Sequence, residues 1–248
     1  MLSARSDADL HGASHEPGVE PDEPGPVVDA GSFAILYALG DERVLRRYRS
    51  GADAGHEARL VSYLAEHGLP VPWVVHRGGP DLEMERLHGP TLLQGLASGE
   101  VPINEGARLM ADLHARLHAI EVPPDLMAVY RPGFVVVHLD LHPGNVVLSE
   151  EKGPVLVGWG SAGLGSPAVD LATTALLVAE VASDEGEEHA RVARAVLAAF
   201  LHEAPSFPDV ALHSAATRRI SDPWLVPGER ELIPSAARLV RRLIGVAR

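Results

Sequence analysis

The feature that most constrains the fold is a nearly uninterrupted apolar stretch, Ala168–Ala182. It contains Asp170 and Glu180, and it is too short to span a bilayer. A segment that is apolar almost all round predicts a buried helix at the centre of a helical body. Ser166 and Pro167 suit the N-cap and the first position of this helix.

The chain before residue 90 has a different pattern, rich in residues that favour strands. The predicted strands are Ser32–Leu39, Arg43–Tyr48, Trp73–His76 and Asp81–Leu87. Gly40-Asp41 predicts a hairpin between the first two. A helix over Asp53–His67 should place Leu60, Leu64 and His67 on one face and end at Gly68. This part should be small and mostly β, with one helix.

The chain after residue 100 is predicted to be mainly helical. Glu105–Ile120 repeats leucine at helical spacing, and further helices are predicted over Arg191–Glu203 and Glu229–Val246. Phe134–Val137 and Val155–Val157 are short apolar strands, and Gly163-Leu164-Gly165 is predicted to be a loop.

Composition and charge exclude several classes of protein. Without cysteine there is no disulfide, Cys-ligated zinc, iron–sulfur cluster or Cys nucleophile. Acidic residues outnumber basic ones 34 to 21, which argues against a nucleic-acid binder. Residues 1–28 form an acidic, proline-rich tail that we expect to be disordered. No signal peptide or membrane span is recognisable, so we expect a cytoplasmic protein.

The segment His138-Leu139-Asp140-Leu141-His142-Pro143-Gly144-Asn145 carries the most chemical information. One interpretation is a hydrolase in which His138, Asp140 and His142 bind zinc. The other is phosphoryl transfer, because His-x-Asp followed by Asn five residues after the Asp is the spacing of a kinase catalytic loop. His114 and His118 are also four residues apart, but the second position of a zinc-protease motif is Ala115 instead of glutamate, which argues against a zinc helix.

The chain resembles the aminoglycoside phosphotransferase / choline kinase-like family, whose members share the protein kinase-like fold. The stretches that carry the resemblance are RVLRRYRSG (43–51), HEARLVSYLAEHGLPVP (56–72), LEMERLHGPTL (82–92), ADLHARLHAI (111–120), HLDLHPGNVVL (138–148) and GPVLVGWGSAGLGSPAVDLA (153–172). The resemblance implies an α+β fold of two lobes, with a small β-rich lobe over 29–85 and a helical lobe over 86–248. It also implies ATP-dependent phosphorylation of a hydroxyl on a small-molecule substrate, with Mg²⁺.

The resemblance also implies roles for individual residues of this sequence. Asp140 corresponds to the catalytic base and Asn145 to a magnesium ligand, while His138 and Asp170 would support the loop. The backbone of Glu85 and Leu87 would meet the adenine edge of the nucleotide. Gly31-Ser32-Phe33 lies where the loop that covers the phosphates belongs.

The resemblance requires a cation for the phosphates on the strand Arg43–Tyr48, and the lone lysine cannot supply it. Lys152 lies after the catalytic loop. On the strand, the two-residue period and the kinase pattern select Arg46, with Glu57 on the next helix as its partner. A guanidinium can hold both a carboxylate and a phosphate.

Gly158 is the main departure from the family pattern. The family has a metal-binding Asp before the tryptophan that corresponds to Trp159, and no acid lies within five residues of Gly158. Losing this ligand should weaken Mg-ATP binding. Two hypotheses therefore remain beside the zinc hydrolase: an active phosphotransferase, and a pseudokinase that binds a nucleotide, a small molecule or a partner protein without chemistry.

Overall fold

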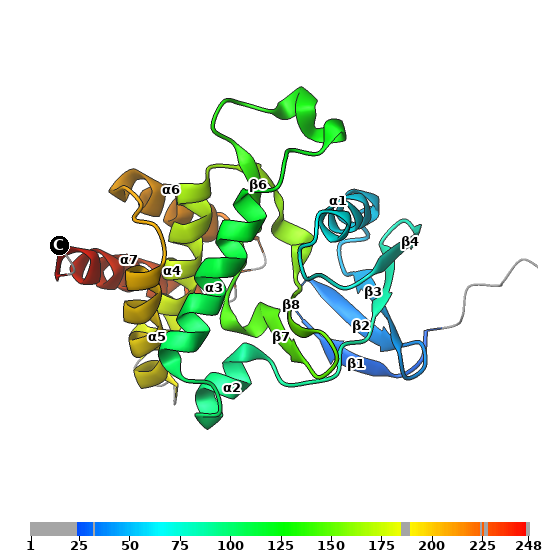
Figure 1. The fold of residues 1–248 in the computed structure, drawn as a ribbon, viewed down its shortest axis with the longest axis horizontal. Coiled ribbons are helices and arrows are strands. Elements are labelled where there is room, and N and C mark those ends of the chain that lie inside the picture. The colour runs from blue at the N-terminus through cyan, green and yellow to red at the C-terminus, as the bar shows by residue number, and fades with distance from the viewer. Residues whose placement is uncertain (1–23, 32, 185–188, 224, 226–227, 247–248) are drawn as a thin grey trace, which may run out of the picture.

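The computed structural model describes residues 24–31, 33–184, 189–223, 225 and 228–246 (Figure 1). The first part is an antiparallel sheet in the order β1-β2-β3-β5-β4. Its strands are β1 Val27–Ala30, β2 Ala34–Ala38, β3 Arg43–Tyr48, β4 Val74–Gly78 and β5 Asp81–Glu85. Helix α1, Gly55–Glu66, packs beside β4. Figure 1 shows this sheet and α1 on one side of the molecule and the long helices on the other.

The β-rich part follows the sequence prediction with two differences. β2 and β3 form the predicted hairpin, with Ala34 opposite Tyr48 and Ala38 opposite Val44. β1 begins at Val27, inside the range 1–28 predicted as a tail, whereas residues 1–23 lie outside the described residues. His67 was predicted to continue the helical face of Leu60 and Leu64, but the helix ends at Glu66 and His67 is its exposed C-cap residue.

The second part contains most of the helices. These are α2 Leu92–Ser98, α3 Ile103–His118, α4 Pro167–Ser183, α5 Ala190–Glu203, α6 Asp209–Ile220 and α7 Glu229–Val246. Two antiparallel pairs of short strands accompany them: β6 Val135–Val137 with β9 Gly163–Gly165, and β7 Val146–Ser149 with β8 Gly153–Leu156. Short 3-10 helices lie at Pro124–Val129, Pro143–Asn145 and Trp159–Ser161.

Helix α4 is the buried central helix that the apolar stretch predicted. It packs against α5, α6 and α7, and Leu176 in its middle is completely buried beside the core that contains Phe200. Each such side chain contributes about 1.5–3 kcal/mol by leaving water. Ser166 is the N-cap residue as predicted, but its hydroxyl makes no capping hydrogen bond.

Three elements differ from the prediction. Gly163–Gly165 is strand β9 rather than a loop, because its backbone pairs with β6. Helix α2 was not predicted although its start has a capping box, in which the Thr91 hydroxyl accepts from the Gln94 N–H and the Gln94 side chain accepts from the Thr91 N–H. Helix α6 was not predicted either. No described helix is long and apolar enough to cross a membrane.

Candidate active site

The loop 138–145 connects β6 to β7 and brings Asp140 and Asn145 together. Asn145 Nδ2 donates to the backbone oxygen of Asp140 at 2.9 Å and to its Oδ2 at 2.9 Å. The turn at Pro143-Gly144 allows this contact across five residues, as the spacing predicted. Burial raises the pKa of the Asp140 carboxyl, although His142 and Asn145 favour its charged form. The Asn145 Oδ1 atom takes no part in these two bonds.

His138 holds the backbone of this loop instead of facing Asp140. Its Nδ1 accepts from the Asp140 backbone N–H at 3.2 Å, so its Nε2 carries the proton and donates to the Val157 carbonyl oxygen at 3.0 Å. The side chain is completely buried, and burial lowers the pKa of His138 to about 4. The neutral ring therefore links the loop to the segment that precedes Gly158.

Asp170 supports the loop from α4. Its Oδ1 accepts from the Leu139 N–H at 2.6 Å, and its Oδ2 accepts from the His138 N–H at 3.0 Å. Leu139 has a φ of 60°, the left-handed region that costs a non-glycine residue free energy. The two bonds to a buried carboxylate offset this cost and fix the loop in one conformation.

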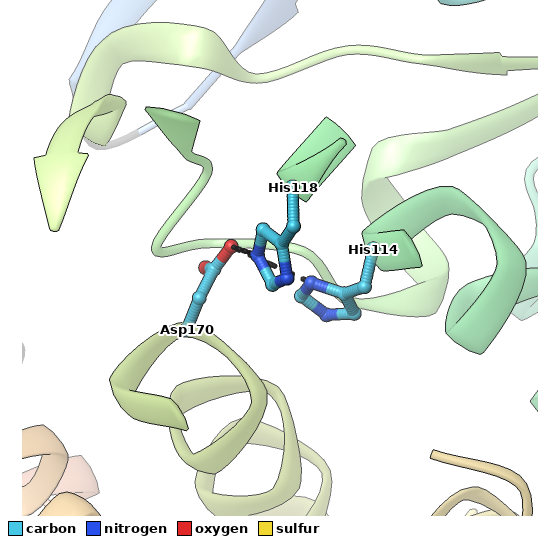
Figure 2. A group of neighbouring side chains, drawn as sticks. All are labelled: His114, His118 and Asp170. Carbon is cyan, nitrogen blue, oxygen red and sulfur yellow. Dashed lines mark hydrogen bonds and ion pairs between the residues drawn. The ribbon is translucent and has the colours of Figure 1, made fainter. Parts of the chain in front are cut away.

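Two histidines of α3 surround the same carboxylate (Figure 2). His118 Nε2 lies 2.9 Å from Asp170 Oδ2, and His114 Nδ1 lies 3.4 Å from it. The three side chains form the one group of histidines and acids among the described residues whose ligand atoms lie within 4.8 Å of one another. Because both oxygens of Asp170 already accept bonds from the loop backbone, we interpret the group as loop support rather than as a metal centre. His138, Asp140 and His142 form no such group.

Gly158 leaves no room for a side chain. Its φ is 84°, which favours glycine, and a Cβ built on it would lie 2.7–2.8 Å from the Asn145 amide group. The Asn145 side chain therefore occupies the space that a side chain at position 158 would take.

Arg46 and Glu57 form the ion pair that the strand period and the resemblance together implied. The guanidinium donates two bonds to the Glu57 carboxylate, at 2.6 and 2.8 Å, and both residues are buried. Tyr48 joins them, because Arg46 Nη2 donates to its hydroxyl at 2.7 Å and that hydroxyl donates to Glu57. Burial raises the pKa of Tyr48 well above its usual value. Tyr48 was missed in the sequence, where it shares the strand face of Arg46.

The other predicted nucleotide contacts lie at the ends of the sheet. Gly31 follows β1, and its carbonyl oxygen accepts from Arg49 Nε at 2.9 Å, while Ser32 lies outside the described residues. Glu85 ends β5, and Leu87 follows it in the connection to α2. The Glu85 backbone N–H donates to the Trp73 carbonyl, and its carboxylate lies 2.5 Å from the amine of Lys152.

A cavity of about 370 Å³ opens beside Asp140. Its lining includes Leu139, Leu177, Arg219 near the end of α6 and Asp222 just after that helix. No sequence pattern indicated Arg219 or Asp222, because their position depends on how α6 packs against α4. The Asp140 carboxylate, whose pKa is raised by burial, thus lies at the wall of a cavity, and the Asn145 carboxamide is hydrogen-bonded to it.

Comparison with known proteins gives a family and a fold. The sequence matches the family model described as "Phosphotransferase enzyme family" over residues 32–134 and 126–213. A comparison with curated protein sequences gives no match.

Solved structures with a similar fold include the complex of gentamicin with APH(2")-IIa, at TM-score 0.54 and 14% identity, covering 90% of this chain and 93% of that one. The ADP-bound aminoglycoside phosphotransferase APH(2'')-Ib gives 0.54 at 14% identity, with coverages of 91% and 95%. A thermostable mutant of aminoglycoside phosphotransferase APH(4)-Ia gives 0.52 at 15%, with coverages of 90% and 94%. The predicted kinase-like α+β fold is confirmed.

Proposed function

Because the chain belongs to the phosphotransferase enzyme family, we propose that it transfers the γ-phosphate of ATP to a hydroxyl group of a small molecule. The observation that carries the proposal is the hydrogen-bonded pair of Asp140 and Asn145 at the wall of a cavity. A carboxylate and a carboxamide five residues apart are the residue types that this reaction needs in one loop.

Asp140 is the base of the proposed reaction. Its carboxylate would accept the proton of the attacking hydroxyl as the new oxygen–phosphorus bond forms and the bond from the γ-phosphorus to the β,γ-bridging oxygen breaks, which releases ADP. The raised pKa of Asp140 makes it a stronger base than an exposed carboxylate. The bond from Asn145 Nδ2 to Oδ2 holds the group in one orientation, which leaves Oδ1 for the substrate.

Asn145 Oδ1 suits Mg²⁺, which takes oxygen ligands and shares its shell with phosphate oxygens and waters. Bound there, Mg²⁺ would neutralise charge on the transferred phosphoryl group. Arg46, fixed by Glu57 and Tyr48, would contact the phosphates from the sheet. We assign the adenine edge to the backbone of Glu85 and Leu87 and the phosphate cover to Gly31, as the sequence predicts.

A second candidate is a pseudokinase that binds ATP or another ligand without transferring phosphate. Gly158 favours it, because the position of a metal-binding acid has no side chain and Asn145 fills the space. With Asn145 as the single protein ligand, the remaining Mg²⁺ ligands would have to be phosphate oxygens and waters, and binding of the ion would be weak.

ADP formation and thermal shift separate the two candidates. Wild type, Asp140→Asn and Gly158→Asp are compared with ATP, with and without Mg²⁺, over a panel of hydroxyl compounds. The phosphotransferase proposal expects a Mg²⁺-dependent shift and ADP formation in the wild type. Asp140→Asn should lower turnover by about 10²–10⁴-fold, the usual contribution of a general base, while keeping the thermal shift.

The Gly158→Asp variant tests the alternative. The new side chain must displace Asn145, so we expect it to lower stability. Thermal shift and turnover that arise only in this variant would establish the pseudokinase. ADP formation that is equal in wild type and Asp140→Asn would reject the proposed base.

A further inference from the structure

A second cavity, of about 310 Å³, also borders the loop 138–145. His142, Pro143 and Gly144 of the loop form one wall. Helices α2, α4, α5, α6 and α7 form most of the rest, mainly with apolar side chains. These include Leu96, Leu177, Val178, Val192, Val196 and Leu232. A cavity with such walls favours a ligand with a mainly apolar body.

The charged groups of this cavity are unevenly balanced. The carboxylates of Glu180 and Glu229 line it, and Arg219 is the one arginine among its described lining residues. Arg219 Nη2 lies 3.2 Å from Glu180 Oε2 and 3.3 Å from Glu229 Oε2. The same guanidinium also lies 3.5 Å from Asp222 Oδ2. One cation therefore serves several carboxylates, and the cavity has an excess of negative charge that a ligand cation would reduce.

The cavity adjoins the one that contains Asp140. Leu177 and Arg219 line both of them. A molecule whose body lies among the apolar side chains can therefore extend past these two residues toward the Asp140 carboxylate. A hydroxyl at the extended end would meet the proposed base.

We propose that this cavity binds the body of the phosphate acceptor, and that the acceptor is a hydroxyl compound with a mainly apolar body and one cationic amine. A polycationic aminosugar is disfavoured, because most of its polar groups would face apolar walls without hydrogen-bond partners. The assignment of the ligand as phosphate acceptor rests on the proposed function, whereas the chemistry of the ligand rests on the cavity alone.

Calorimetric titration without nucleotide tests the ligand class. Phenylalaninol has an apolar body, one amine and one hydroxyl, and hydrocinnamyl alcohol is the same molecule without the amine. Gentamicin serves as the polycation. We expect phenylalaninol, or a longer amino alcohol of the same kind, to bind saturably and about tenfold more tightly than either comparison compound, a difference of about 1.4 kcal/mol.

A pair of variants places the binding in this cavity. Val181 lines it and is 39% exposed, so Val181→Arg should fold and add a cation next to the carboxylates. We expect it to weaken amine binding by about tenfold. Val210→Arg is the control, because Val210 is 68% exposed on α6 and outside the lining of both cavities.

Several outcomes would overturn the inference. These are tighter binding of gentamicin, equal binding of the two alcohols, equal effects of the two arginine variants, or no saturable binding across amino alcohols of increasing apolar length. Because the titration contains no ATP, it is independent of the chemistry at Asp140. Amine binding without ADP formation would reject the proposed phosphotransferase function and support the ligand class. Phosphate transfer to a polycation would support the phosphotransferase function and reject the ligand class.

Discussion

Acid should destabilise this protein through His138, the buried ring that holds the loop 138–145. In the unfolded chain a histidine has a pKa of about 6.5. In the folded protein burial lowers the pKa of His138 to about 4, because a charged ring would lose its hydration, and a protonated Nδ1 would also have to give up the bond from the Asp140 N–H. The folded state therefore resists protonation between these two values.

The sign and size of the effect follow from these pKa values. Above pH 6.5 neither state binds the proton and the full stability is present. As pH falls toward 4, only the unfolded state binds it, so the free energy of unfolding decreases. Between pH 7 and pH 5 the loss from this one group is about 2 kcal/mol, and it approaches about 3 kcal/mol near pH 4.

Urea unfolding at pH 7 and pH 5 measures this loss, with His138→Gln as the comparison. Burial also lowers the pKa of His142, so the wild type contains more than one contribution of the same sign. The difference between wild type and variant isolates His138. We expect the variant to be less stable at pH 7 but to lose about 2 kcal/mol less on acidification.

An equal loss in both proteins would refute the reasoning about His138. If the variant fails to fold, the proton NMR titration of the His138 ring in the wild type decides instead. A ring that titrates near the ordinary value of about 6.5 would contradict a buried neutral histidine.

Two further predictions concern stability, each measured by urea unfolding at pH 7. Arg46→Ala should lower the free energy of unfolding by about 3 kcal/mol, because it leaves the buried Glu57 carboxylate without its cation. The control, Arg47→Ala on the same strand, removes a partly exposed partner of Asp81 and should cost less than about 1 kcal/mol. Equal losses in the two variants would show that the Arg46–Glu57 pair behaves like an exposed ion pair. Thr91→Ala should lower the free energy of unfolding by about 1 kcal/mol, because it removes the N-cap of α2, whereas Thr91→Ser should keep most of that stability. A Ser variant as unstable as the Ala variant would argue against capping by the Thr91 hydroxyl.

Sequence periodicity predicted the parts of the fold that depend on neighbouring residues. The hairpin at Gly40-Asp41 and the buried helix α4 are of this kind. Arg46 could be selected because alternate residues of a strand share a face, and the ion pair with Glu57 has the predicted partners. The spacing of Asp140 and Asn145 indicated that one loop carries both side chains, and in the structure they are hydrogen-bonded to each other.

The remaining features depend on contacts between distant segments. The Arg219 network joins α6 to Glu180 of α4, a separation of 39 residues, and no local pattern specifies it. The resemblance implies that Gly158 replaces an acid, but the sequence did not indicate that the Asn145 side chain lies against Gly158 or that the Gly158 backbone is left-handed. Short elements such as β9 form because a partner strand is nearby, which a three-residue sequence cannot encode.

The pair of Glu85 and Lys152 gives the molecule a natural reporter. Lys152 carries the only side-chain amine in the chain. Its ion pair with Glu85 connects the turn between β7 and β8 to strand β5 of the five-stranded sheet. An acylating reagent at high pH therefore has one lysine to modify, and its rate there measures how often the pair separates. Mass spectrometry of that single adduct, with and without ATP, would follow the motion of the sheet relative to the helices without any engineered label.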